Sequence, residues 1–428
     1  MENTTLRDQP SDDFHMAFLA KSMNKAGIAA IGGLVALGVV AAIAMTPSVK
    51  ALPPLEHDAY IWQRSWRAPL LDSIAANKDL VRSWRILAAH VSPAGALVPV
   101  TVQAKALEES GRPLIMVVRI DGQLANFDQV RLLDQILTLH QRWRDHGIRI
   151  AGLEIDHDCG TAKLPGYAKF LTQLRDRLDR GIQLSITALP AWNVSPFLGD
   201  VLGAVDESVL QVHSVQHPVG GLFSPIQAAK WISEYAKKSP TAFRVALPTY
   251  GSRVGLDDSG NVTFVESELA FGRGSASAQE LIVAPESVRQ LILAVNGNRP
   301  KNLLGYAWFR LPTDADQRAW SIATWRAVVQ DKPLTQAARI VARPTSDPKL
   351  FDLFVKNTGD TDVSPPARIL LASNCNDADG VSGYEARTIE KRFWLVRPTP
   401  SLLHPQGEIS VGWARCDHDP SKDLHAQS

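Results

Sequence analysis

Two periodicities alternate along the middle of the chain. Short apolar runs with the composition of β-strands occur at 60–64, 86–91, 114–121, 151–158, 183–189, 209–215, 243–248 and 303–309. Between many of them, apolar residues recur every three or four positions, which predicts helices over 126–147, 165–180, 196–205, 225–238, 285–296 and 317–330. One longer polar excursion, from 251 to 279, interrupts this pattern.

Alternating strands and helices predict an α/β fold with a parallel sheet and right-handed crossovers. Eight strand-like units in succession predict a (β/α)₈ TIM-type barrel over residues 56–332. A doubly wound sheet is the alternative arrangement of the same units.

The pattern changes near Lys332 and Pro333. Shorter β-type runs follow, separated by Gly, Pro, Asn and Asp, at 349–360, 367–374, 391–396 and 409–416. They predict a small C-terminal β-sandwich within residues 340–428, with residues 419–428 as a frayed tail.

The N-terminal region contains an apolar run, Ala26 to Met45, without any charged residue. As a helix it would be roughly 30 Å long, the thickness of a bilayer core. Lys21 and Lys25 precede it, so we expect residues 1–25 in the cytoplasm and a transmembrane anchor at 26–46. A cleaved signal peptide is the alternative, because Val49-Lys50-Ala51 resembles a cleavage site. The main body is then periplasmic and anchored to the inner membrane, or secreted if the segment is cleaved.

The composition is that of a soluble globular protein beyond this segment. Among 428 residues, 45% are hydrophobic and 21% charged, and the net charge of +1 argues against a nucleic-acid partner. Cys375 and Cys416 could form a disulfide in an oxidising compartment, whereas Cys159 is expected to be a packed residue rather than a nucleophile. No cysteine and histidine spacing suggests zinc, and we expect neither a metal nor a cofactor.

The strand at 151–158 carries three acidic residues at alternate positions, Glu154, Asp156 and Asp158. Side chains two apart on a strand share a face, so these carboxylates would repel one another if buried without partners. We therefore expect a catalytic or ligand-binding group here. In the alternative interpretation the acids lie at a solvated strand end and pair with arginines.

Active sites of such barrels lie at the carboxyl ends of the strands. The candidate substrate-binding residues at those ends are Trp62, Arg119, Asp121, His213, Tyr250 and Trp308. Each has a structural alternative: Arg119 as a counter-charge for buried acids, and His213 and Trp308 as core residues.

The stretch from Gly152 to Asp158 resembles the fourth-strand signature of the family-18 chitinases, in which acidic residues recur at every second position. The resemblance implies that Asp158 occupies the proton-donor position. Segments 247–251 and 304–308 are similar to that family's seventh and eighth strands. That family carries Glu at the donor position and Asp at the first, so Glu154 and Asp158 are interchanged here, and Gln211-Val212-His213 replaces its Met-x-Tyr-Asp pattern.

Residues 56–330 more closely resemble a bacterial family of unknown function, the domain-of-unknown-function family 3142. The resemblance lies in a Tyr-x-Trp-Gln-Arg start and the acidic residues of the fourth strand. It implies the same barrel fold and assigns no activity.

Together these features predict an exported, glycoside-hydrolase-like barrel that acts on an envelope or extracellular glycan by general acid catalysis. Asp158 would be the acid, its pKa raised by neighbouring Asp156, and Asp156 and Glu154 would complete the catalytic group. A non-catalytic glycan-binding protein and a structural envelope protein are the two alternatives.

Overall fold

The computed structural model describes residues 53–122, 124, 128–214, 220–257, 259, 262–266 and 278–427. The expected cytoplasmic tail at 1–25 and the expected anchor at 26–46 lie outside this part of the chain. Within the described residues, no helix combines the length and apolarity needed to cross a membrane.

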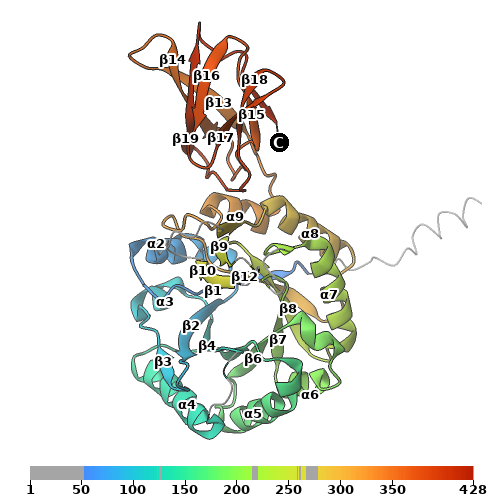
Figure 1. Ribbon diagram of the computed structural model, residues 1–428. Coiled ribbons are helices and arrows are strands. Elements are labelled where there is room, and N and C mark those ends of the chain that lie inside the picture. Colours follow the sequence, from blue (N-terminus) through green and yellow to red (C-terminus); the bar gives the residue numbers. More distant parts are fainter. Residues whose placement is uncertain are drawn as a thin grey trace, which may run out of the picture. The chain divides into compact units, whose positions relative to one another are not determined.

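Eight parallel strands close into a barrel (Figure 1). They follow the order β1-β2-β4-β5-β6-β7-β8-β12, and β12 pairs again with β1. The strands are β1 (Glu56–Ile61), β2 (Trp84–Val91), β4 (Leu114–Ile120), β5 (Gly152–His157), β6 (Gln183–Ala188), β7 (Glu207–Gln211), β8 (Ala242–Pro248) and β12 (Leu303–Phe309). This arrangement confirms the predicted barrel and excludes the doubly wound alternative.

Helices surround the barrel strands, as the view along the barrel shows (Figure 1). They are α2 (Ala68–Asn77), α3 (Ala104–Ser110), α4 (Gln129–Asp145), α5 (Leu164–Arg177), α6 (Leu198–Gly203), α7 (Pro225–Lys238), α8 (Pro285–Gly297) and α9 (Ile322–Val329). In α5 the buried residues Tyr167, Phe170, Leu171 and Leu174 recur at helical spacing and pack into the main apolar core.

The alternation predicted for the acidic strand is present in β5. Leu153 and Ile155 belong to the apolar core, whereas Glu154 and Asp156 contact polar side chains of other barrel strands. All four side chains are buried, because one face of the strand is covered by helices and the other by the barrel interior.

Several predicted boundaries differ from the structure. Helix α4 begins at Gln129, because the Asp128 side chain accepts a hydrogen bond from the Arg131 amide and caps it; Asn126, the expected cap, lies outside the described residues. Helix α9 begins at Ile322 rather than 317, after the cap Ser321. The sequence pattern also gave no sign of a short strand, β3 (Leu97–Pro99), which pairs with β2.

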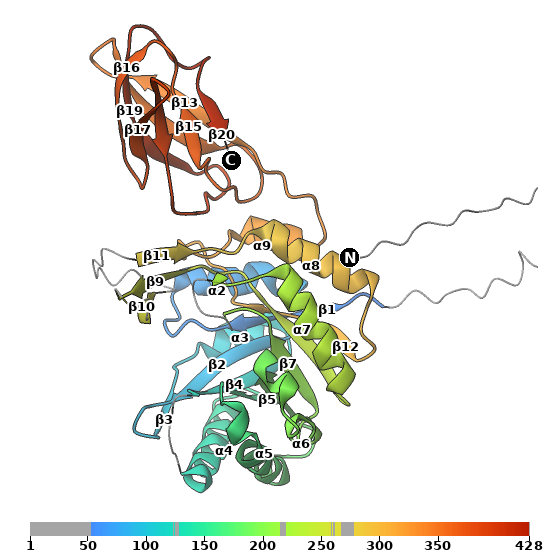
Figure 2. The same ribbon diagram turned by 45° about the vertical axis from the view of Figure 1, so that its right-hand side comes forward.

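The polar excursion after β8 contains an antiparallel sheet that periodicity did not predict. Its strands are β9 (Ser252–Leu256), β10 (Val262–Glu266) and β11 (Ala278–Leu281), with β9 in the centre (Figure 2). The strands are only four or five residues long and mix apolar with polar residues, so hydrophobic alternation gives little signal for them.

The C-terminal part consists of two four-stranded antiparallel sheets. One has the order β13 (Ala338–Pro344), β14 (Leu350–Asn357), β19 (Glu408–Cys416), β16 (Cys375–Gly380), and the other β17 (Glu385–Ile389), β18 (Arg392–Val396), β15 (Arg368–Leu370), β20 (His425–Gln427). A second apolar cluster, separate from the barrel core, includes Leu353, Val355, Ile369, Leu395 and Val411. The four predicted runs correspond to β14, β15, β18 and β19.

The expectation of a frayed C-terminal tail is wrong for its last residues. His425, Ala426 and Gln427 form β20 and pair with β15. Main-chain hydrogen bonds hold this strand although all three of its side chains are exposed, so no apolar alternation marks it.

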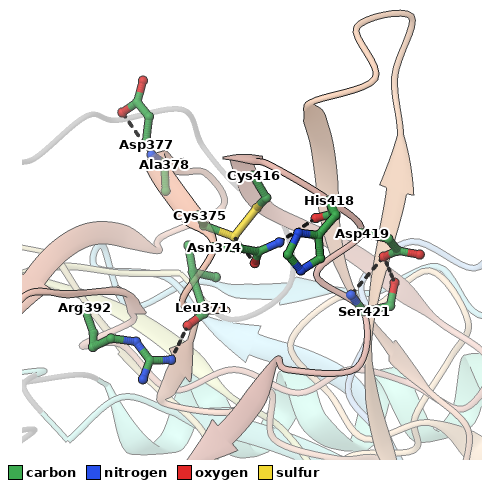
Figure 3. The surroundings of a disulfide bond; sticks show 10 residues. All are labelled: Leu371, Asn374, Cys375, Asp377, Ala378, Arg392, Cys416, His418, Asp419 and Ser421. Atoms are coloured by element: carbon green, nitrogen blue, oxygen red, sulfur yellow. Dashed lines mark hydrogen bonds between the residues drawn. A yellow bond between two sulfur atoms is a disulfide. The ribbon is translucent and has the colours of Figure 1, made fainter.

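The predicted disulfide between Cys375 and Cys416 is present (Figure 3). The two cysteines are register partners on the neighbouring strands β16 and β19, and both are buried. Cys159 is a free, buried cysteine in the barrel.

Removal of this disulfide should destabilise the C-terminal sheets. The bond closes a loop with a sequence separation of 41, for which chain entropy predicts a loss of about 4 kcal/mol in the free energy of unfolding. The double variant Cys375→Ala/Cys416→Ala should show this loss in a denaturant titration. Cys159→Ala is the matched control, and its unfolding should remain sensitive to a reductant; an unchanged transition in the double variant would contradict the prediction.

Candidate active site at the mouth of the barrel

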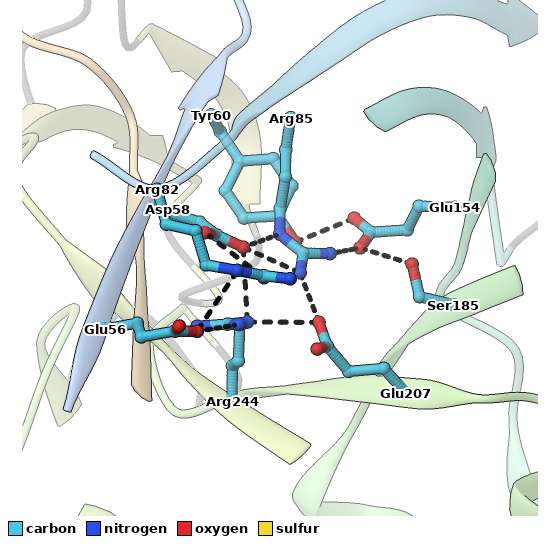
Figure 4. Close-up of polar contacts among 9 residues, drawn as sticks. All are labelled: Glu56, Asp58, Tyr60, Arg82, Arg85, Glu154, Ser185, Glu207 and Arg244. Atoms are coloured by element: carbon cyan, nitrogen blue, oxygen red, sulfur yellow. Dashed lines mark hydrogen bonds and ion pairs between the residues drawn. The ribbon is translucent and has the colours of Figure 1, made fainter. Parts of the chain in front are cut away.

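A cluster of buried charges fills the part of the barrel interior that lies towards the amino ends of the strands (Figure 4). The guanidinium of Arg85 contacts Asp58 at 2.9 Å and also pairs with Glu154 and Glu207. Arg244 contacts Asp58 and Glu207, each at 3.2 Å. All five side chains are at most 1% exposed.

This cluster combines three buried carboxylates with two buried guanidinium groups. Burial raises the pKa of Glu154, although Arg85 acts in the opposite direction. Burial also disfavours the ionised form of Asp58, but Arg85 and Arg244 outweigh it and lower the pKa of that carboxyl. A proton held by Glu154 would balance the charges of the cluster.

Glu154 therefore lies beneath the site rather than in it. Its oxygens accept hydrogen bonds from the Tyr60 hydroxyl at 2.7 Å and from Ser185 at 3.2 Å, in addition to Arg85. The side chain has no exposed surface, so it does not contact a molecule bound at the mouth. Glu154 was expected in the catalytic group, but in the structure it belongs to the buried charge cluster.

A second polar layer lies above this cluster, at the carboxyl ends of the strands. Arg119 on β4 pairs in register with His90 on β2 and Asp156 on β5. Its guanidinium bridges two acids, Asp156 at 2.7 Å and Asp158 at 2.5 Å. The other oxygen of Asp156 accepts a hydrogen bond from the Thr187 hydroxyl on β6. Four neighbouring strands thus contribute to one polar row.

This row forms one wall of a pocket of about 260 Å³ at the barrel mouth. Most of the expected site residues line it: Trp62, Arg119, Asp156, Asp158, His213 and Tyr250. The structure therefore brings together side chains from the ends of five strands, β1, β4, β5, β7 and β8.

Asp158 is a pocket-lining acid with one oxygen that forms no hydrogen bond to a described residue. Its Oδ2 is bound to Arg119, whereas Oδ1 is buried and has no hydrogen-bond partner among the described residues. Burial raises the pKa of this carboxyl, Asp156 adds to the rise, and Arg119 opposes it. Arg119 itself stays charged, because the two acids raise its pKa against the effect of burial.

The opposite wall is aromatic and neutral. The His213 imidazole lies next to the Tyr250 hydroxyl, with 3.4 Å between Nδ1 and the oxygen, and burial lowers the pKa of His213 to about 3. Burial raises the pKa of Tyr250 to about 12. Trp62 packs edge-on against Phe309 with 5.0 Å between ring centroids. Trp62 is only half-buried, so it offers surface to a ligand.

Two expected substrate-binding residues lie outside this pocket. Trp308 is fully buried behind the barrel wall, where it packs against Trp320 and Trp325 and donates a hydrogen bond to His57 at 3.0 Å. Trp308 is therefore a core residue, which was the alternative interpretation of its role. Asp121 is exposed beyond the end of β4, and its charge contributes to the raised pKa of Asp158 without lining the pocket.

Phe309 and Thr187 line the pocket although the sequence did not mark them as candidates. Phe309 follows Trp308 directly, and successive side chains of a strand point to opposite faces. Assigning the other face of this strand to the site would have identified Phe309. Across the described ranges, no group of three His, Cys, Asp or Glu side chains is arranged to hold a metal ion.

Comparison with protein families identifies most of the barrel. Residues 110–314 match the family described as Domain of unknown function (DUF3142). This part of the chain is similar to the DUF3142 family. The match confirms the resemblance to that family, and residues 340–417, which contain most of the C-terminal sheets, match a second one, Domain of unknown function (DUF8456).

Solved structures similar to this chain are mostly chitinases, at low identity. A chitinase from Chromobacterium violaceum ATCC 12472 is 14% identical over 65% of this chain and 98% of that one, with a TM-score of 0.46. The spore cortex-lytic enzyme SleL of Bacillus cereus is 16% identical over 65% and 74%, with the same TM-score. A class V chitinase from Nicotiana tobaccum, solved with NAG4, is 14% identical over 65% and 98%, at 0.44. No curated protein matches the chain.

Loss of Arg85 should destabilise the barrel strongly. The variant Arg85→Met would leave three carboxylates in the interior with Arg244 as the remaining buried cation, and breaking a buried ion pair costs about 3–5 kcal/mol. Arg82→Met is the matched control, because Arg82 pairs with the same Asp58 at 4.0 Å but is 40% exposed; it should cost about 1 kcal/mol or less. Denaturant titration measures both, and equal losses would contradict the central role of the cluster.

Proposed function

We propose that the pocket binds a sugar residue of an envelope or extracellular glycan and that Asp158 acts as a general acid in hydrolysis of its glycosidic bond. The observation that carries this proposal is the position of the Asp158 carboxyl. One oxygen is held by Arg119, and the other is buried beside the pocket without a partner among the described side chains.

This geometry suits a protonated acid. Oδ2 can keep accepting the hydrogen bond from Arg119 while Oδ1 carries the proton, since a carboxylic acid retains acceptor capacity when it is protonated. The proton would pass to the glycosidic oxygen as the bond to the anomeric carbon breaks, and water would complete the hydrolysis at that carbon. Asp158 would then regain a proton from solvent.

Asp156 supports the reaction through its charge. Arg119 and Thr187 occupy its two oxygens, so it is poorly placed to attack the sugar. Its negative charge raises the pKa of Asp158 and would stabilise the positive charge that develops on the sugar ring. The attacking group would be water or a group of the substrate.

The size and walls of the pocket favour a single sugar ring. A volume of about 260 Å³ lies below the ~300–1,000 Å³ of sites for drug-sized ligands. The half-exposed Trp62 beside Phe309 supplies an aromatic surface against which the apolar face of a sugar ring can pack. These features support recognition of one residue at a chain end more than a long oligosaccharide groove.

Export of the main body is part of the proposal. The Cys375–Cys416 disulfide supports an oxidising compartment such as the periplasm. The apolar run at 26–46 would anchor the chain in the inner membrane, or be cleaved to release it.

A second candidate function is glycan binding without turnover. The ion pairs from Arg119 to both Asp156 and Asp158 favour it, because a cation shared between two acids favours their ionised forms. The same pocket would then bind a sugar through Arg119, Trp62 and Tyr250.

Substitution of Asp158 separates these functions. In a hydrolase, Asp158→Asn should reduce turnover of a chromogenic glycoside by about 10²–10⁴-fold with little change in sugar affinity, because an amide keeps the shape but lacks the acidic proton. The wild-type rate should fall as the pH rises through the raised pKa of Asp158. Asp156→Asn should shift this fall to lower pH, because it removes a charge that raises that pKa.

The assays are a panel of chromogenic glycosides and a glycan array, both with the full-length protein. Asp200→Asn, an exposed aspartate of α6, is the matched control and should behave as wild type. Binding without turnover by both wild type and Asp158→Asn would favour the second function, and absence of both would reject the two together.

A further inference from the structure

The two arginines that line the pocket, Arg119 and Arg64, differ in their ion pairs. The guanidinium of Arg119 forms one ion pair to each of two acids. Arg64, in the segment after β1, also lines the pocket, yet it is exposed and forms no ion pair or hydrogen bond with any residue that the structure describes. Among the described residues, Arg64 is therefore a cation at the mouth without an ion-pair partner.

His90 provides a second unsatisfied group near Arg64. It lines the same pocket from β2, and its Nδ1 is buried without a hydrogen-bond partner in the described part of the chain. Burial lowers the pKa of His90, and the positive charge of Arg64 lowers it further. A neutral imidazole can donate one hydrogen bond from Nδ1.

We infer that the sugar bound in this pocket carries a carboxylate, which pairs with the Arg64 guanidinium and accepts a hydrogen bond from His90. This inference rests on the proposed function, because it assigns a substrate class to the same site. It separates the pocket into two regions: Asp158 and Arg119 at the bond to be cleaved, and Arg64 and His90 at the acidic substituent.

The charge balance argues for a group with a single negative charge. With Asp158 protonated, Asp156 and Arg119 neutralise each other, and Arg64 leaves an excess of one positive charge among the pocket-lining residues. A carboxylate satisfies that excess, whereas a phosphate ester would bring about two negative charges at neutral pH. Arginine also binds a planar carboxylate through two parallel hydrogen bonds.

Matched pairs of sugars test this inference. We would titrate the full-length protein by calorimetry with the methyl glycosides of glucuronate and glucose, galacturonate and galactose, and N-acetylmuramate and N-acetylglucosamine. In at least one pair the carboxylated sugar should bind about 10-fold more tightly, the contribution of one charge-assisted hydrogen-bonded contact. An increase in ionic strength from about 0.05 M to about 0.5 M should weaken the carboxylated sugar alone.

Two variants identify the responsible side chain. Arg64→Gln should remove the roughly 10-fold preference and leave the neutral sugar's affinity unchanged, whereas Arg64→Lys should retain part of it. Arg67→Gln is the matched control, because Arg67 is an exposed arginine three residues away that does not line this pocket. It should bind both sugars as the wild type does.

The outcomes distinguish this inference from the proposed function. Equal affinities within every pair, or a loss in Arg64→Gln that affects both members equally, would overturn the carboxylate assignment and leave glycan binding intact. No binding of any sugar would reject both proposals. The salt dependence of the wild-type protein gives a result even if a variant does not fold.

Discussion

The fold depends on how charges are accommodated inside a closed barrel. Arg85 and Arg244 project into a space that contains Asp58, Glu154 and Glu207, and none of these groups reaches solvent. Ions taken out of water are tolerated only with close partners and further hydrogen bonds. The interior therefore requires all five side chains together, and this requirement fixes which residues of β1, β2, β5, β7 and β8 face one another.

The site above depends on this cluster. Tyr60 donates its hydroxyl to Glu154 below and lines the pocket above, so one side chain joins the two layers. Glu154 and Asp156 are consecutive inward positions of β5, and the register of the lower layer therefore sets the position of the acids in the upper one. Arg119 can pair with the two acids of the pocket because the cluster beneath it holds its own counter-ions.

The barrel could be predicted from the sequence because its strands are buried on both faces and appear as near-continuous apolar runs. The acidic residues of β5 could also be recognised from the sequence, because charged residues are unusual in an apolar run. The buried partners were harder to recognise, because Arg85 and Arg244 each occur singly in an apolar strand and nothing local indicates which acid each contacts. Trp308 shows a different limit. An error of one residue in assigning the faces of the strand confuses this core side chain with its neighbour Phe309, which lines the pocket. The edge strands β3, β10 and β20 were not predicted, because main-chain pairing rather than apolar burial holds them.

The short strand β20 has a consequence for the edge of its sheet. It forms one edge of its sheet and covers the outer main-chain groups of β15. Without it, the amide and carbonyl groups of β15 would form an open edge, a surface onto which a strand from another molecule can add. Residues 425–427 thus shield the main chain of β15 from strand addition on that side.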